Sequence, residues 1–269
     1  MRIQIEYRTT YRYEFAASGI VQALRLRPGV HDGQHIHHWR VDVDIDGVMR
    51  GSIDPFGNRL DMFYADVPAM ALTISVAGEA DVIETAGLIK GTAEPLPTAI
   101  FLRQTPLTLP DAAIVELAES ARGATPLDSL HALMAAIHGG MAFETGATDA
   151  ATPATTAFAA GRGVCQDFAH IFSAGARHLG IPARYVSGHL ARAELQGASH
   201  AWAEAFVPDL GWIAFDPANG ICTTDAYLRV AIGLDYLDAA PVRGARRGGG
   251  SESLDVSVQA VDAMRQSQG

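Results

Sequence analysis

Residues 161–182 read GRGVCQDFAHIFSAGARHLGIP, and this stretch decides the fold of the chain. After Cys165, apolar and small residues recur at the spacing of one helix face, at Phe168, Ile171, Phe172, Gly175, Ala176 and Leu179. Gly180 and Pro182 then end the pattern, because glycine and proline terminate helices. The stretch therefore predicts a buried helix that begins at or near Cys165 and follows a glycine-rich loop.

A cysteine in the first turn of a helix is placed for reactivity. Unpaired backbone N–H groups and the positive end of the helix dipole favour its thiolate over the thiol. The same N–H groups can receive the oxyanion of a tetrahedral intermediate. A small buried cysteine that caps a helix fits the position of Cys165 equally well, so position alone leaves both interpretations open.

The region after this helix predicts a pair of strands. Residues 184–190 form the first, and a turn over residues 193–197 leads to the second over residues 199–207. In the second strand the even positions are large or polar, and they share one face: His200, Trp202, Glu204 and Phe206. This strand therefore presents a histidine beside aromatic and acidic side chains.

The connection to the next strand, residues 212–216, decides whether His200 and Asp216 can meet. A four-residue connection would put the two side chains on opposite faces. A connection of three or five residues, or a bulge, puts them on the same face, directly across or on the diagonal. The carboxylate can then accept a hydrogen bond from the imidazole, and the two residues can form a catalytic triad with Cys165. Each of these residues taken alone also has an ordinary structural interpretation.

The first 86 residues predict an antiparallel β domain. In residues 3–15 the odd positions are apolar, aromatic or β-branched, which is the period of a strand with one buried face. Residues 35–45 form another one-sided strand, and residues 46–47 and 54–58 are turn signals. Several strands with turns at short spacing are typical of a sandwich or barrel. We expect a sandwich-like domain over residues 1–86.

The remaining chain predicts a linker and a second domain. Residues 87–110 carry four prolines and little periodicity, so we expect a linker packed along the surface. Residues 111–269 follow as the second domain, in which Thr125 and Pro126 are typical of a helix start. Residues 254–258 alternate between apolar and polar side chains, which predicts a final strand.

Composition argues against several classes of function. The formal net charge is -10 and the basic residues do not cluster before Arg243, which argues against nucleic-acid or anionic-membrane binding. Only two cysteines occur, Cys165 and Cys222, so disulfides do not hold the chain together. Residues 1–15 lack the apolar core of a signal peptide, and no apolar run reaches the ~18–20 residues of a membrane span. We therefore expect a cytoplasmic protein in which Cys165 stays a free thiol.

No pattern predicts a metal or a cofactor. Residues 42–47 mimic the start of a calcium-binding loop, but Ile53 stands where that loop needs its last acid. Four histidines lie close together in the sequence: His31, His35, His37 and His38. No cysteine or pair of acids accompanies them, so we expect no metal site there.

Four stretches, taken as a set, resemble the bacterial transglutaminase-like family, whose members are described as cysteine proteases: residues 161–170, 180–188, 199–202 and 211–217. Residues 54–58 resemble part of the β-rich, transglutaminase-associated domain that precedes the core in this family, and residues 233–244 resemble its tail. The resemblance covers nearly the whole chain. It implies an α+β protein, with an N-terminal antiparallel β-sandwich-like domain followed by a papain-like, transglutaminase-like catalytic core.

The same resemblance implies which residues act. The family's triad corresponds to Cys165, His200 and Asp216. The chain departs from the family pattern at Ala218, where threonine is expected, and at residues 143–145, which lack an aromatic at the third place. Neither departure touches the triad. Candidates for binding the substrate or the oxyanion are Gln166, Trp202 and Trp212.

The expected function is cysteine-dependent acyl transfer. The Cys165 thiolate would attack an amide carbonyl of a protein or peptide and form a thioester, and water or an amine would then accept the acyl group. Hydrolysis of a peptide or isopeptide bond is the favoured outcome. The alternatives are protein-glutamine amine transfer, acetyl transfer from coenzyme A to an arylamine, and a non-catalytic binding module that keeps the fold.

Overall fold

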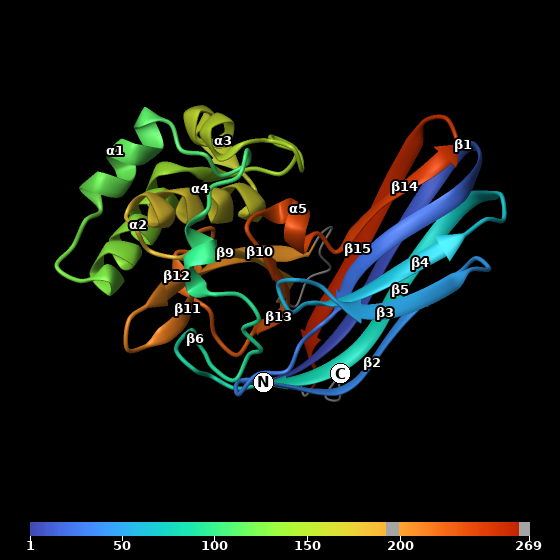
Figure 1. Ribbon diagram of the computed structural model, residues 1–269, viewed down its shortest axis with the longest axis horizontal. Helices are drawn as coiled ribbons and strands as arrows, with labels where there is room; N and C mark the ends of the chain where they lie inside the picture. The colour runs from blue at the N-terminus through green and yellow to red at the C-terminus, as the bar shows by residue number, and fades with distance from the viewer. Residues whose placement is uncertain (192–198, 264–269) are drawn as a thin grey trace.

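The computed structural model describes residues 1–191 and 199–263 and has the predicted α+β architecture. Figure 1 shows a curled sheet on one side and a second sheet, covered by helices, on the other. The turn predicted over residues 193–197 lies outside the described residues. None of the helices within the described ranges is both long and apolar enough to cross a membrane.

The first sheet is antiparallel and is organised around one long strand. Its members are β1 (Arg2–Arg27), β2 (Gln34–Val43), β3 (Val48–Ile53), β4 (Arg59–Ala65), β5 (Ala69–Val82), β14 (Val242–Gly248) and β15 (Glu252–Asp262). The first half of β1 pairs with β5 and β15, so that Ile5 lies opposite Gly78 and Ala260. The second half pairs with β4 and β14. Between the halves the chain bends near Gly19, whose φ of 54° suits glycine.

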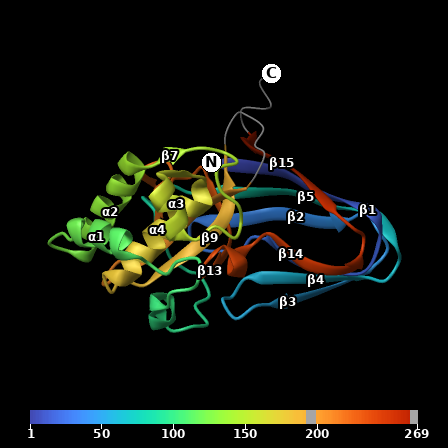
Figure 2. The same cartoon turned by 90° about the horizontal axis from the view of Figure 1, so that it is seen from above.

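This bend folds the sheet over itself into two layers. Figure 2 shows β15, β5 and β2 on one side of the curl and β14, β4 and β3 on the other. Apolar side chains from both layers fill the space between them, among them Ile3, Ile5, Ile20, Leu24, Phe63, Leu72 and Ile74. The predicted sandwich-like region is therefore confirmed, with the alternating residues of β1 facing its core.

The C-terminal strands join this same sheet. The alternating residues predicted to form a final strand lie in β15, which pairs with the first half of β1. A glycine turn at residues 248–250 connects β14 to β15, and all three glycines have positive φ. The sandwich therefore contains both ends of the described chain, and the domain boundaries near residues 86 and 110 stay a prediction.

The second sheet carries the helices on one face. Its strands are β6 (Leu88–Ile89), β9 (Ala183–Leu190), β10 (His200–Val207), β11 (Gly211–Asp216), β12 (Ile221–Cys222) and β13 (Tyr227–Gly233). The strand order is β12-β11-β10-β9-β13, and β6 pairs with β11. A short parallel pair, β7 (Ala142–Phe143) and β8 (Arg162–Gly163), lies just before the central helix.

The helices pack as one layer around α4. They are α1 (Ala112–Ser120), α2 (Pro126–Gly140), α3 (Ala154–Ala160), α4 (Cys165–His178) and α5 (Tyr236–Ala239), with the 3-10 helix η1 at Thr98–Leu102. Thr125 caps α2 through Asp128, with Pro126 at its first position, as predicted. The face of β10 toward α4 carries Ala203 and Ala205, whose small size lets the helix approach closely. This packing fixes the start of α4 relative to β10.

The segment between the two predicted domains is packed rather than loose. Residues 87–110 add β6 to the edge of β11 and place the Phe101 ring of η1 in the core. From α4, the guanidinium of Arg177 donates hydrogen bonds to the carbonyl oxygens of Phe101, Ala183 and Leu234. The segment is therefore tied to the helix and sheet that it crosses.

Two side-chain amides of the curled sheet bind the backbone of the edge strand β13. Gln34 donates to the carbonyl of Arg229 at 2.9 Å and accepts from its N–H at 2.8 Å. Asn58 makes the same pair of bonds with Ile232, at 2.7 and 2.8 Å. Asp54 in turn accepts from the backbone and side-chain amides of Asn58. The turn at residues 54–58 therefore holds β13 in place.

We expect Asn58→Leu to destabilise the whole protein, because it leaves the N–H and C=O of Ile232 buried without partners. Each unpaired group costs about 1–3 kcal/mol, so the free energy of unfolding should fall by about 2–6 kcal/mol. Urea unfolding at 25 °C measures this change.

The matched control is Ser52→Ala, which removes an exposed hydroxyl from β3 nearby. Its effect should stay within about 0.5 kcal/mol. Equal losses for the two variants would show that Asn58 does not carry the docking of β13.

Candidate active site

The sequence before α4 builds a helix start around Cys165. The Asp167 carboxylate accepts hydrogen bonds from the Val164 N–H at 2.7 Å and from the Thr148 hydroxyl at 2.6 Å. A side chain at Gly163 would come within 2.5 Å of that carboxylate, so glycine is required in the approach to the helix. Cys165 is the first residue of α4 and is half-buried, which confirms the predicted helix start.

The β10–β11 register brings His200 and Asp216 together. The connection has three residues, since Val207 pairs with Gly211. Continuing this register places Asp216 across from Trp202 and diagonal to His200, on the same face of the sheet. The His200 Nε2 and Asp216 Oδ2 atoms lie 2.6 Å apart. The structure therefore has the same-face arrangement that the triad hypothesis requires.

Asp216 is fully buried, and both of its carboxylate oxygens accept hydrogen bonds. Its Oδ1 atom accepts from the backbone N–H groups of Ala218 and Asn219, at 3.0 and 3.1 Å. Its Oδ2 atom accepts from the Asn219 side chain at 2.6 Å and from the Tyr227 hydroxyl at 2.8 Å. Burial raises the pKa of Asp216, but the hydrogen bond and charge of His200 and these donors outweigh it and lower the pKa. The carboxyl group is therefore ionised at neutral pH.

His200 is held as a cation. Burial lowers its pKa, but hydrogen bonds with Asp216 and Cys165, and the charges of both, raise it to about 10. Because Nε2 binds Asp216, Nδ1 is the ring nitrogen that remains for Cys165. The site therefore combines a proton-bearing imidazole with the Cys165 sulfur on one side and a fixed carboxylate on the other.

The other predicted binding residues take different positions. Trp202 is buried, and its ring lies 6.2 Å from the His200 ring. Trp212 packs under the Arg184 guanidinium at 3.8 Å and beside Phe101 and Phe206, not beside His200. The Gln166 side chain donates to the Asp149 carbonyl at 3.4 Å. A role in binding substrate or the oxyanion stays a prediction for all three.

Sequence reasoning missed the contribution of Tyr227. Its hydroxyl binds Asp216, although Tyr227 lies on β13, three strands away from β11 in the sheet order. Tyr227 starts a strand of mainly apolar residues, so nothing in its immediate sequence distinguishes it from a core residue. The contact joins strands that are not neighbours in the sheet, so it is a tertiary property that local sequence does not encode.

Known protein families and related sequences match this chain over most of its length. Residues 3–81 match the bacterial transglutaminase-like N-terminal region, and residues 116–217 match the transglutaminase-like superfamily. An uncharacterized protein of Mycobacterium leprae is 28% identical over 277 residues, which cover 96% of this chain and 98% of the relative. An uncharacterized protein of Mycobacterium tuberculosis is 30% identical over 290 residues, which cover 97% and 92%.

A solved structure shares the whole fold. The crystal structure of a "putative cysteine protease" from Cytophaga hutchinsonii matches with a TM-score of 0.74 and 22% identity, covering 98% of this chain and 91% of that one. The resemblance stated from the motifs is thereby confirmed, for the core and for the N-terminal region. This chain belongs to the transglutaminase-like superfamily, with the bacterial transglutaminase-like N-terminal region ahead of its core.

Proposed function

We propose that this protein is a cysteine-dependent enzyme that cleaves amide bonds through a thioester on Cys165. The observation that carries the proposal is the position of His200, which interacts with Cys165 and binds Asp216 at 2.6 Å. A nucleophile, a proton carrier and an orienting acid in this order are the parts that acyl transfer needs. Membership of the transglutaminase-like superfamily supports the same chemistry.

The first step forms the acyl-enzyme. The Cys165 thiolate adds to the amide carbonyl carbon, a C–S bond forms, and the carbonyl π electrons move onto oxygen. The Asp167 N–H already donates to the Val164 carbonyl, so the Cys165 and Gln166 N–H groups in the first turn of α4 are the ones that stabilise this oxyanion. When the oxyanion collapses, the C–N bond breaks and the His200 imidazolium gives its proton to the departing nitrogen. A free amine leaves, and the thioester remains.

The second step releases the acyl group. The neutral His200 imidazole takes a proton from water as the water oxygen attacks the thioester carbonyl. The C–S bond breaks, a carboxylic acid leaves, and Cys165 returns to the thiolate beside the imidazolium. Throughout both steps Asp216 fixes the orientation of the ring and stabilises its positive charge.

We propose a peptide or isopeptide bond of a protein or peptide as the substrate, and water as the acceptor. The name of the Cytophaga hutchinsonii protein with this fold supports hydrolysis. We also propose a cytoplasmic, reducing setting, since Cys165 and Cys222 are both free thiols.

Alkylation of the two cysteines tests the nucleophile. At pH 7 we expect iodoacetamide to modify Cys165 at least about 10-fold faster than Cys222, because thiolates react and thiols do not. Burial raises the pKa of Cys222, which makes it a suitable internal control. Peptide mapping by mass spectrometry measures both rates in the wild type, the Cys222 rate in Cys165→Ala and the Cys165 rate in Cys222→Ala. Equal rates for the two cysteines would contradict the proposal.

The role of Asp216 appears in the pH dependence. Above the pKa of His200 the Cys165 thiolate loses its imidazolium partner, so the alkylation rate should step to a second plateau around that pKa, at about 10, and this step is the alkaline limb of the profile. Asp216→Asn removes the negative charge that raises it, and we expect the limb to move down by about 1–3 pH units.

Asp61→Asn serves as the control for this measurement. Asp61 is a buried carboxylate that pairs with Arg27 at 2.6 Å in the N-terminal sheet. Its substitution removes an ion pair in the other sheet, so the pH of the alkaline limb of Cys165 alkylation should not change. A limb unmoved by Asp216→Asn would remove Asp216 from the proposed triad.

The acceptor can be read from the mass of the product. In water enriched in oxygen-18, hydrolysis of a peptide library should add one heavy oxygen to each new carboxylate. With a primary amine present, transfer to the amine would instead give an amide product. We expect labelled carboxylates with the wild type and none with Cys165→Ala. Amide products in excess of carboxylates would replace hydrolysis by amine transfer.

A further inference from the structure

Three aromatic rings form a buried cluster behind the proposed triad. The rings of His200 and Tyr227 lie 5.9 Å apart, those of His200 and Trp202 lie 6.2 Å apart, and those of Trp202 and Tyr227 lie 5.5 Å apart. These separations are within the range of direct ring packing. A side chain at Gly188 would overlap the Trp202 ring, so the strand next to β10 leaves room for this cluster. The imidazole therefore has two ring neighbours that limit its rotation.

Tyr227 contacts the triad a second time through its hydroxyl. The hydroxyl donates to Asp216 Oδ2 at 2.8 Å, which is the same oxygen that faces His200 Nε2 at 2.6 Å. One side chain thus packs against the imidazole and also binds the carboxylate that orients it. Tyr227 is 5% exposed, so both contacts lie away from bulk water.

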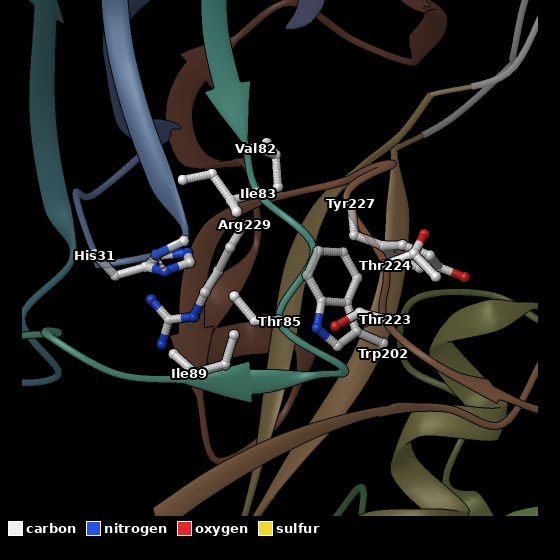
Figure 3. Close-up of a pocket in the computed structure, with 11 residues that line it drawn as sticks. His31, Val82, Ile83, Thr85, Ile89, Trp202, Thr223, Thr224, Tyr227 and Arg229 are labelled. Carbon is white, nitrogen blue, oxygen red and sulfur yellow. Dashed lines mark hydrogen bonds between the residues drawn. The ribbon is translucent and has the colours of Figure 1, made fainter. Parts of the chain in front are cut away.

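The N-terminal region limits the movement of Tyr227. Gln34 and Asn58 hold β13 at Arg229 and Ile232, two and five residues after Tyr227. Trp202 and Tyr227 also line a pocket, and Figure 3 shows them on one side of it and His31 on the other. The Tyr227 ring is therefore held by contacts with the second sheet and lies close to the N-terminal region.

We infer that Tyr227 is a positioning residue of the proposed active site, which holds the Asp216 carboxylate and the His200 ring in their working orientation. The inference rests on the proposed function. It gives the N-terminal region a part in catalysis, because the amides of Gln34 and Asn58 fix the strand from which Tyr227 acts.

The titratable groups around His200 come from four elements. They are Cys165 of α4, His189 of β9, Asp216 of β11 and Tyr227 of β13. Burial lowers the pKa of His189 to about 4, so this ring is neutral and adds no charge. The pKa of His200 therefore reports chiefly on its distance and orientation to Asp216 and Cys165.

Tyr227→Phe tests the inference, since it removes the hydroxyl and keeps the ring. NMR titration of histidine-labelled protein gives the pKa of His200 without any substrate. If the hydroxyl holds Asp216 toward the imidazole, its loss should lower this pKa by about half a unit or more. The alkaline limb of Cys165 alkylation should move down by the same amount.

Tyr7→Phe is the matched control. Tyr7 is also 5% exposed, and its hydroxyl makes one hydrogen bond, to Thr9 at 2.6 Å, in the N-terminal core. It should lower thermal stability as Tyr227→Phe does and leave the pKa of His200 unchanged. A second variant, Tyr227→Leu, removes the ring as well and should shift the pKa further than phenylalanine does.

An unchanged pKa in Tyr227→Phe would reduce Tyr227 to a core residue, and a raised pKa would mean that its hydroxyl only competes with His200 for the carboxylate. Either result overturns the inference. Failure of the proposed function is separate, because it appears in the wild type as equal alkylation of Cys165 and Cys222. If Cys165 reacts fast in the wild type but the pKa of His200 is unchanged in Tyr227→Phe, only the positioning role of Tyr227 is overturned.

Discussion

The edge of β13 is the constraint on which the arrangement of the molecule depends. An edge strand presents unpaired N–H and C=O groups, and burying them without partners is costly. A carboxamide carries one acceptor and a donor group, so Gln34 and Asn58 can each replace one residue of a missing neighbouring strand. Gln34 starts β2 and Asn58 precedes β4, so one amide comes from each layer of the curl. The second sheet can therefore be buried against the first in one register only.

Buried charge ties β13 to β9 and β10 within its own sheet, on the face that also carries His200. Glu204 lies fully buried between Arg184 and Arg229, at 2.6 and 2.7 Å. Burial raises the pKa of Glu204, but the two guanidinium groups lower it to about 2, so the group stays ionised. Removing one member would leave the others buried and unpaired, which is strongly unfavourable. The network also explains the position of Trp212, whose ring is covered by Arg184 and belongs to this layer.

Local patterns in the sequence were sufficient to place Cys165, His200 and Asp216 on their helix and strands, while their roles came from the resemblance to a family. The helix start at Cys165 follows from apolar spacing and glycines, and the meeting of His200 with Asp216 follows from strand parity once the connection is three residues long. Long-range side-chain bonds were not predictable in this way. Gln34 and Arg229 are 195 residues apart, and no local period connects them. The same holds for Tyr227, whose hydroxyl binds Asp216 although their strands are not neighbours in the sheet.

The pairing of β1 with β14 and β15 has a consequence for how the chain is made. A ribosome releases the N-terminal residues first, yet one flank of β1 stays without its partners until residues 242–262 have emerged. The sandwich, although built mostly from residues 2–82, is thus completed only when β14 and β15 join it. Until then β1 has an open strand edge, whose unpaired N–H and C=O groups can pair wrongly with another chain.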